Sequence, residues 1–330
     1  MKPKLPGFVR CIAMLLATVC SLAASPALAQ DVWPARPIRV IVTFPPGGST
    51  DVAMRIVAPR LAERLGQPVL VDNRAGAGGG VGLTAVARSA PDGYTLVLAS
   101  AGGLTANASL STNPGYDGLK DFAPVTLFGT SPFVLVARAS LPAKDVREVL
   151  ALARAQPGRL TFASGGNGTA MHLAGELLKA TAKSYIVHIP YRGSGPALVA
   201  VAGGETDLAI VDIATVRPLA SSGRIKLLAV LDAKRSPLAP NLPTMAESGL
   251  AGYEAAGWFA VLAPAGTPPA IVARLNAEIT AVLRTPDVGE RFAEAGLEPL
   301  PSTPEALAQR MRIDTGKWAQ VIKTSGARNE

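Results

Sequence analysis

The chain has 330 residues, of which 48% are hydrophobic and 17% charged, and 32 Lys and Arg against 24 Asp and Glu give a net charge of +8. The basic residues are scattered, without a long run and without interleaved aromatic residues, so a nucleic-acid partner is not expected. The only two cysteines, Cys11 and Cys20, lie near the N-terminus.

The first 29 residues have the pattern of an export signal. Three basic residues precede an apolar stretch from Cys11 to Ala24, and a small-x-small cleavage site, Ala27-Leu28-Ala29, follows. A membrane anchor is the alternative, but the apolar run is shorter than the ~20 residues that a span needs. A lipid anchor on Cys20 is disfavoured because Val19 stands where a small residue is usual. We therefore expect cleavage after Ala29 and export to the periplasm.

Removal of this segment takes away both cysteines, which excludes a disulfide framework and a thiol nucleophile in the mature chain. Three of the 32 basic residues go with it, leaving 29 against 24 acidic residues, an excess of +5. Such an excess favours anionic ligands by electrostatic steering, or only keeps the surface soluble.

Strand-like and helix-like segments alternate in the first part of the mature chain. Turn signals such as Pro91-Asp92-Gly93 separate them, which is the pattern of βαβ units around a parallel sheet. The expected elements are a strand at 38 to 43, a helix at 50 to 65, a strand at 68 to 72, a helix at 80 to 89 and a strand at 94 to 99.

A second alternating series follows a stretch, 100 to 132, that is rich in Gly, Ser, Thr, Asn and Pro and reads as connections. Its expected strands lie at 133 to 138, 160 to 163, 185 to 188, 207 to 211 and 225 to 231. Its expected helices lie at 145 to 155, 169 to 180, 194 to 202 and 215 to 221.

The C-terminal part has one more strand, 258 to 262, and three helices, at 268 to 284, 287 to 295 and 304 to 324. Because these do not make a third α/β unit, we expect the chain to return to the first domain. The prediction is an α/β fold of two lobes: 30 to 131 with 254 to 330, and 132 to 253. Two segments then cross between the lobes and form a hinge.

The turn FPPGGSTD, residues 44 to 51, follows the first strand and begins the first helix. Backbone N–H groups at such a helix start point outward, with the positive helix end behind them, and attract anions. Gly47 and Gly48 admit a ligand close to the backbone. The alternative is a tight connection in which Ser49, Thr50 or Asp51 only caps the helix.

The turn SGGNGT, residues 164 to 169, has the same setting in the second series and is the stronger candidate. It combines three glycines with the side chains of Ser164, Asn167 and Thr169, which offer several donors to an anion. Two such turns on two α/β units predict a cleft that holds a small anion from both sides.

The glycine run from Arg74 to Gly82 resembles a dinucleotide-binding loop but does not fit the motif of one. Counted from Gly76, the third glycine of G-x-G-x-x-G falls on Val81, and no acidic residue for a ribose is evident. A second strand-to-helix turn is the simpler interpretation.

Enzyme signatures are also missing. Neither Ser49 nor Ser194 lies in G-x-S-x-G, and the mature chain has only two histidines, His172 and His188, which more often pack or cap than catalyse. With no cysteine and no ligand cluster, a metal site is not expected. We predict no cofactor and no catalytic residue.

Other wall residues follow from the rule that the carboxyl ends of strands face the crevice of an α/β sheet. Tyr191 and Asp212 come after such strands, and Asp212 takes a ligand ammonium or caps a helix. Trp258 and Phe259 form either a lid or the core, and we favour the core.

The chain resembles the periplasmic solute receptors of the tripartite tricarboxylate transporters, often called Bug receptors. The stretches that carry the resemblance are WPARPIRVIVTFPPGGSTDVAMRIVAPRLAERLGQPVLVDNRAGAGG, APDGYTLVLAS, FASGGNGTAMHLAGELLKA, VHIPYRGSGPAL, AKRSPLAPNLPTMAESGL, GWFAVLAPAGTP and KWAQVIKTSGA.

The resemblance implies a two-lobed type II periplasmic-binding-protein fold (a Venus flytrap) that closes on a carboxylate, with the SGGNGT turn as the main direct donor and the FPPGGSTD turn closing over it. The implied site, together with the wall residues above, consists of Phe44, Gly48, Ser49, Thr50, Ser164, Asn167, Gly168, Thr169, His172, Tyr191 and Asp212. Departures from the family occur at Ile213, where many members have Asn after the Asp, and in 101 to 109, which lack a histidine often found there.

The leading hypothesis is therefore a monomeric receptor that captures a carboxylate and delivers it to a membrane transporter of the tripartite tricarboxylate type. The alternatives are a sensing module that reports to a sensor kinase, and a periplasmic enzyme. The particular acid, whether dicarboxylate, tricarboxylate, amino acid or aromatic acid, is left open.

Overall fold

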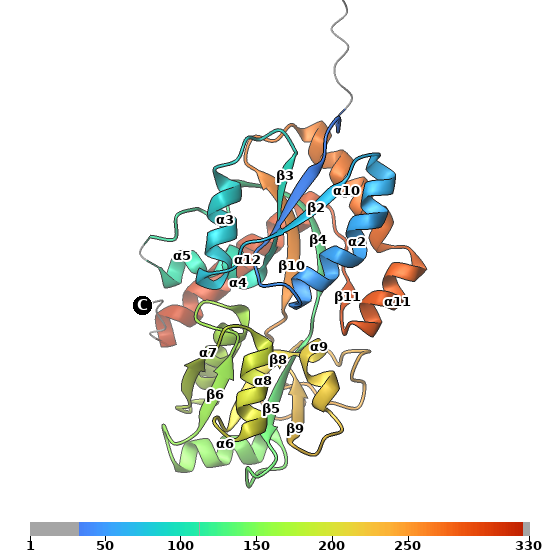
Figure 1. The fold of residues 1–330 in the computed structure, drawn as a ribbon. Coiled ribbons are helices and arrows are strands. Elements are labelled where there is room, and N and C mark those ends of the chain that lie inside the picture. Colours follow the sequence, from blue (N-terminus) through green and yellow to red (C-terminus); the bar gives the residue numbers. More distant parts are fainter. Residues whose placement is uncertain (1–32, 112, 326–330) are drawn as a thin grey trace, which may run out of the picture. The chain divides into compact units, whose positions relative to one another are not determined.

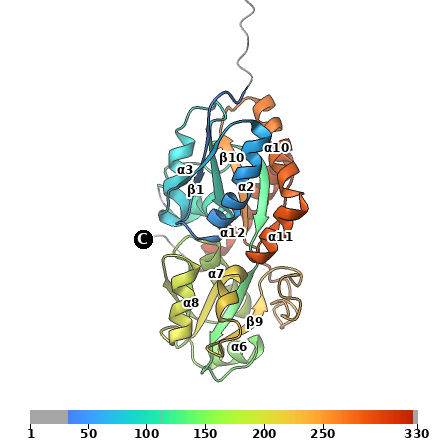
Figure 2. The same cartoon turned by 45° about the vertical axis from the view of Figure 1, so that its right-hand side comes forward.

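The computed structural model describes residues 33–111 and 113–325. The chain divides into the segment Met1–Ala35 and a compact unit, Arg36–Glu330, and every element below lies in that unit. The predicted export signal, with Cys11, Cys20 and the cleavage site after Ala29, lies outside the described residues. Figures 1 and 2 show two α/β lobes, each built on its own sheet.

The first lobe contains a six-stranded sheet in the order β11-β4-β10-β3-β1-β2. Strands β1, β2 and β3 run parallel, whereas β10 runs antiparallel to both β3 and β4. The bounds are β1 Ile38–Val42, β2 Val69–Asn73, β3 Thr95–Ser100, β4 Phe122–Thr130, β10 Trp258–Pro264 and β11 Glu298–Pro299.

The second lobe contains a five-stranded sheet in the order β7-β6-β8-β5-β9. Here β6, β7 and β8 are parallel, and β5 runs antiparallel to β8 and β9. The bounds are β5 Phe133–Arg138, β6 Thr161–Ser164, β7 Val187–Pro190, β8 Leu208–Asp212 and β9 Ile225–Val230.

Both sheets therefore follow one plan, three parallel strands and an antiparallel strand inserted between the third and the fourth. The inserted strands, β5 and β10, are the first strands after the chain passes from one sheet to the other. The two predicted crossings are thus the β4–β5 and β9–β10 connections, and the predicted two-lobed α/β fold is confirmed.

Helices cover both faces of each sheet, as expected for parallel strands that are buried on two sides. Those of the first lobe are α2 Ser49–Leu65, α3 Gly80–Ala87, α4 Ala101–Thr105, α5 Asn107–Leu110, α10 Pro269–Leu283, α11 Pro286–Glu294 and α12 Pro304–Ser325, with a short 3₁₀ turn, η1, at Ala77–Gly79. Those of the second are α6 Val146–Ala155, α7 Ala170–Ala182, α8 Ser194–Gly203 and α9 Ile213–Val216, followed by η2 at Arg217–Leu219. None of these helices is both long and apolar enough to cross a bilayer.

Helix α12 is anchored in the cores of both lobes. Leu307 and Met311 belong to a core cluster of the first lobe, whereas Trp318 and Ile322 belong to the core of the second, where α12 packs against α7. Between them the indole Nε1 of Trp258 donates to Asp314 Oδ2 at 2.7 Å. The predicted lobe boundaries stay a prediction, and the last turns of α12 tie the two lobes together.

The predicted strands and helices begin and end within about two residues of those observed. The stretch 100 to 132 is the main exception, because it contains α4, α5 and the nine-residue strand β4 instead of connections alone. The two-residue strand β11 was not predicted either. Pro124 and the small residues of β4 weaken its strand pattern, and its partner β10 lies far along the chain. Local propensity therefore could not identify it.

Trp318→Ala tests the anchoring of α12. Removal of a fully packed indole should lower the free energy of unfolding by about 3 to 5 kcal/mol, measured by urea denaturation. Lys323→Ala, an exposed change on the same helix, should alter it by less than about 0.5 kcal/mol. Equal effects of the two substitutions would show that α12 does not depend on the second core.

Candidate ligand-binding site

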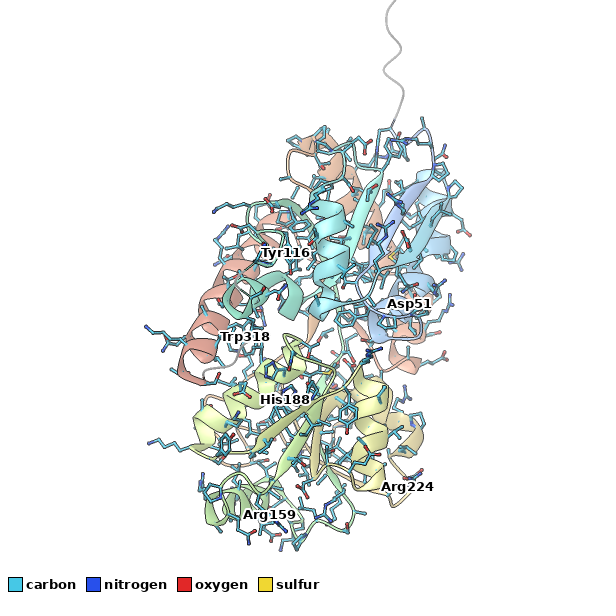
Figure 3. The ribbon with its side chains drawn as sticks, turned by 60° about the vertical axis from the view of Figure 1, so that its left-hand side comes forward. Asp51, Tyr116, Arg159, His188, Arg224 and Trp318 are labelled. Atoms are coloured by element: carbon cyan, nitrogen blue, oxygen red, sulfur yellow. The ribbon has the colours of Figure 1, made fainter. Side chains whose placement is uncertain are left out.

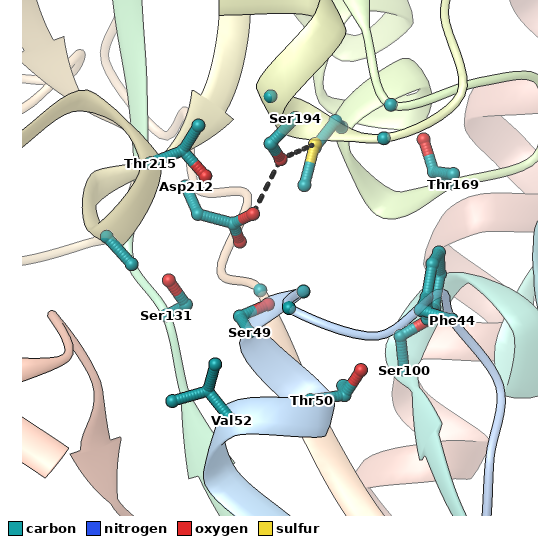
Figure 4. A pocket seen from close by; sticks show the side chains of 18 of the residues that line it. Phe44, Ser49, Thr50, Val52, Ser100, Ser131, Thr169, Ser194, Asp212 and Thr215 are labelled. Carbon is teal, nitrogen blue, oxygen red and sulfur yellow. Dashed lines mark hydrogen bonds between the residues drawn. The ribbon is translucent and has the colours of Figure 1, made fainter. Parts of the chain in front are cut away.

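A cavity of about 540 Å³ lies at the carboxyl ends of β1, β3, β6, β7 and β8, where ligands of α/β proteins usually bind. Residues of both lobes line it (Figure 4). The lining consists of Phe44, Pro45, Pro46, Gly47, Gly48, Ser49, Thr50, Val52, Ser100, Ser131, Phe133, Gly165, Thr169, Ala170, Met171, Arg192, Gly193, Ser194, Gly195, Pro196, Asp212, Ala214, Thr215, Pro218, Gly257, Trp258, Phe259 and Ala295.

The FPPGGSTD turn forms a continuous part of this wall, and the buried carboxylate of Asp51 holds its shape. Asp51 accepts from Gly47 N–H and from the side chains of Arg55 and Asn73, each at 2.9 Å. Asn73 also donates to the carbonyl of Phe44 at 3.0 Å. Burial opposes ionisation of Asp51, but these hydrogen bonds outweigh it and keep its pKa below the ordinary value. Asp51 thus stabilises the turn behind the cavity wall (Figure 3).

The start of α2 is open toward the cavity. Gly48 is its N-cap residue and provides no side-chain cap, so the first amides of the helix are left for an anion or water. Thr50 is 4% exposed, and its hydroxyl has no hydrogen-bond partner among the described residues. Ser100, at the end of β3, is partly exposed, but its hydroxyl is buried and also lacks a partner among those residues. Unpaired buried hydroxyls are costly, so this arrangement suits a bound acceptor.

The SGGNGT turn is built differently, because its hydroxyls are engaged within the turn. Thr169 Oγ1 donates to the carbonyl of Gly166 at 2.8 Å and caps α7 by accepting from His172 N–H. Ser164 Oγ pairs with His188 Nε2 at 2.6 Å and accepts from Gly166 N–H. Of this turn, only Gly165 and Thr169 line the cavity.

The predicted site residues therefore separate into two groups. Phe44, Gly48, Ser49, Thr50, Thr169 and Asp212 lie in the cavity wall. Ser164, Asn167, Gly168, His172 and Tyr191 lie outside it, and the Tyr191 hydroxyl instead reaches Glu205 at 3.3 Å. Ile213, the departure from the family pattern, packs into the core of the second lobe.

Asp212, the last residue of β8, is a buried acid in the cavity wall. Its Oδ2 accepts from Ser194 Oγ at 2.6 Å, at the first turn of α8. Burial raises the pKa of Asp212 to about 6, although the hydrogen bond from Ser194 and the nearby hydroxyl of Ser131 lower it in part. Among the described residues that line the cavity, Asp212 is the single acid and Arg192 the single base.

Sequence reasoning missed several lining residues. Ser100 is the last residue of β3, so the strand-end rule could have found it, whereas Ser131 follows β4, the strand that was not predicted. Met171 and Ser194 lie in the first turns of α7 and α8. Trp258 and Phe259 are buried in β10 and also line the cavity, so their core role does not exclude contact with a ligand.

Residues 53–327 match the sequence profile of the tripartite tricarboxylate transporter family receptor. The chain belongs to this receptor family. BugT of Bordetella pertussis is 40% identical over 323 residues, which cover 98% of this chain and 99% of that relative. The expected type of protein, a periplasmic receptor rather than an enzyme, is thereby confirmed.

Two solved structures of similar proteins contain dicarboxylates. One, from R. palustris with adipate, is 36% identical, with a TM-score of 0.83, and the match covers 90% of this chain and 99% of that one. MatC from Rhodopseudomonas palustris with bound malate is 34% identical, with a TM-score of 0.80 and coverage of 88% and 100%.

Two glycines let the lobes of the receptor touch beside the cavity. A Cβ atom on Gly102 of α4 would lie 2.6 Å from the amide nitrogen of Ala170 and 2.9 Å from the carbonyl oxygen of Gly168. A Cβ atom on Gly78, in the glycine run, would lie 3.2 Å from the carbonyl oxygen of Asn167. The SGGNGT turn thus packs against the first lobe, and no side chain fits between them.

A histidine pair of the second lobe, the buried His172 and the partly buried His188, supports the SGGNGT turn. Figure 3 labels His188. The rings of His172 and His188 stack with centroids 4.1 Å apart, and His172 Nδ1 accepts from Gly168 N–H at 3.3 Å. Burial lowers the pKa of His172 to about 4 and that of His188 to about 3. Both rings are therefore neutral at neutral pH, where Nδ1 of His172 can accept this bond.

His172→Gln tests the linkage between this pair and stability. Between pH 6.5 and about 4 the unfolded chain binds a proton on His172 that the folded receptor does not, so stability falls as the pH drops through this range. The difference in unfolding free energy between the receptor and the variant should shrink by on the order of 2 kcal/mol. Urea denaturation at several pH values measures it, and a constant difference would show that His172 titrates alike in both states.

Proposed function

We propose that the receptor captures a small organic acid in the cavity between its lobes and delivers it to a membrane transporter of the tripartite tricarboxylate type. The observation that carries this proposal is the open start of α2, where an uncapped helix end lies beside Thr50 and Ser100, two residues of the cavity lining whose buried hydroxyls have no partner among the described residues. Amides, a positive helix end and two hydroxyl donors suit a carboxylate.

The ligand class is taken from this geometry together with the dicarboxylates bound to the two R. palustris relatives. On the first lobe, Gly48, Ser49, Thr50 and Ser100 would bind the carboxylate directly. On the second, Thr169 would contribute mainly through the N–H groups at the start of α7, because its hydroxyl is already bonded to Gly166. This assigns the leading role to the FPPGGSTD turn.

Capture would then close the lobes, since a ligand that contacts both lobes favours the state in which both contacts form. Segments 30 to 131 with 254 to 330 would move as one lobe and 132 to 253 as the other, with the β4–β5 and β9–β10 connections as the hinge. We further propose that the chain reaches the periplasm by cleavage after Ala29 and acts there as a monomer.

Thr50→Val separates ligand binding from stability. The change removes a buried hydroxyl without a partner, so the free energy of unfolding should stay equal or rise. Loss of a hydrogen bond to a charged group should weaken binding of a carboxylate such as adipate by about 10-fold to 100-fold, measured by calorimetry. Thr181→Val, on the exposed end of α7, is the matched control and should change neither quantity.

Unchanged affinity for the carboxylate in Thr50→Val would show that the start of α2 does not bind the ligand. Thr169→Val provides a contrast, because it breaks the bond to Gly166 and the cap of α7. We expect that variant to lose stability by about 1 to 2 kcal/mol as well as affinity.

Gly102→Ala tests closure. The new methyl group would meet the backbone of Ala170 and Gly168, so the lobes should be held further apart. We expect at least about tenfold weaker ligand binding and a larger radius of gyration with ligand, measured by calorimetry and small-angle scattering. Gly316→Ala, where a Cβ atom meets nothing within 4 Å, is the control. Unchanged scattering and affinity would argue against closure at this contact.

A further inference from the structure

The cavity has two polar ends of opposite character. In Figure 4, Asp212 and Ser194 lie on one side of the cavity, and Thr50, Ser100 and Thr169 lie on the other. The end near Thr50 offers donors without partners, as described above. The end at Asp212 offers an acidic side chain instead.

No salt bridge joins Asp212 to a basic side chain within the described part of the chain. Its one direct bond from another side chain comes from the Ser194 hydroxyl to Oδ2, which leaves acceptor capacity on the carboxylate. The residue is only 6% exposed, so water solvates this charge poorly. Arg192, the one basic side chain among the described lining residues, is itself exposed and lies more than ion-pair distance from Asp212.

The N-terminus of α8 already has an acidic side chain on its cavity side, that of Asp212, whereas the N-terminus of α2 has none. The carboxylate accepts from Ser194, the first residue of α8, and so already places an acidic group at that positive helix end. At α2 the corresponding acid, Asp51, is turned back to Gly47, Arg55 and Asn73 behind the wall. The helix N-terminus that remains available to a ligand carboxylate is therefore that of α2.

The wall between the two ends is apolar. Phe44, Phe133, Met171, Trp258 and Phe259 are among the residues that line the cavity, so a ligand that spans it would contact them with a hydrocarbon chain or ring. A second ligand carboxylate next to Asp212 would bring two like charges together in a poorly hydrated space, which is unfavourable. An ammonium or hydroxyl group there would instead donate to the free oxygen of Asp212.

Building on the proposed function, we infer that Asp212 determines specificity. It selects carboxylates that carry a hydrogen-bond donor, an ammonium or a hydroxyl group, at the end away from Thr50 and Ser100, and it disfavours a second carboxylate in that place. Burial also raises the pKa of Asp212 to about 6, which agrees with a charge that lacks a basic side chain as partner among the described residues.

The experiment compares four straight-chain acids that differ only at the far end, which carries methyl, hydroxyl, ammonium or carboxylate. The six-carbon set is hexanoate, 6-hydroxyhexanoate, 6-aminohexanoate and adipate, and sets of four and eight carbons cover other lengths. Binding to the mature receptor is measured by calorimetry at about pH 8, where Asp212 is ionised. At the best length, the ammonium and hydroxyl acids should bind at least about tenfold more tightly than the dicarboxylate.

Asp212→Asn is the decisive variant. It should weaken binding of the ammonium acid at least about tenfold, strengthen binding of the dicarboxylate, and change the methyl acid by less than about threefold. The neutral amide has almost the same shape and avoids the burial of a charge, so the variant should fold. Glu205→Gln, an exposed acid of the same lobe, is the matched control and should preserve the wild-type order.

A dicarboxylate that binds most tightly to the wild-type receptor, with the same order of acids in Asp212→Asn, would overturn the inference and leave carboxylate capture intact. Binding of no carboxylate at any length would instead overturn the proposed function. Ser194→Ala supplies a second test, because it keeps the charge of Asp212 and removes only its neighbour. The preference for the ammonium acid should survive in that variant, and its loss would contradict a role for the charge.

Discussion

The carboxylate of Asp51 holds together the wall on which the cavity of the first lobe depends. It is buried in the first turn of α2, and its hydrogen bonds reach back to Gly47 in the FPPGGSTD turn and across to Asn73 at the end of β2. Asn73 in turn holds the carbonyl of Phe44. Because the carboxylate of Asp51 forms its hydrogen bonds behind the cavity wall, the first amides of α2 remain available on the cavity side.

The two glycine-rich turns have similar sequences and different roles in the structure. In the SGGNGT turn the hydroxyls are satisfied by the turn itself and by the histidine pair, which makes it a rigid support. In the FPPGGSTD turn the backbone is held from behind and the hydroxyl of Thr50 has no partner. Composition alone suggested the opposite order, since the SGGNGT turn contains more polar groups. What matters for a ligand is which donors remain unpaired.

The connection between the lobes must let the lobes move and also hold them together. Residues 131–132 join β4 to β5, the much longer segment 231–257 joins β9 to β10, and α12 packs into both cores. Gly78 and Gly102 let the backbones of the two lobes approach beside the cavity. Closure would thus occur against a contact made of backbone atoms, where even one added methyl group would interfere.

The sequence by itself determined the secondary structure, the two-lobed fold and the family of this protein. Hydrophobic periodicity, turn residues and the alternation of elements predicted nearly all strands and helices, the two α/β lobes and the two crossings, because these depend on local chain geometry. Strand β4 was not predicted, because its pairing with β10 is a contact between distant parts of the sequence. Motifs spread along most of the chain were sufficient for the family. Only the tertiary structure decided which polar groups face the cavity. Ser164 and His172 lie behind it, Ser100 and Ser131 line it, and Asp212 lies opposite Thr50, because hydrogen-bond partners and burial depend on elements that are brought together from distant parts of the chain.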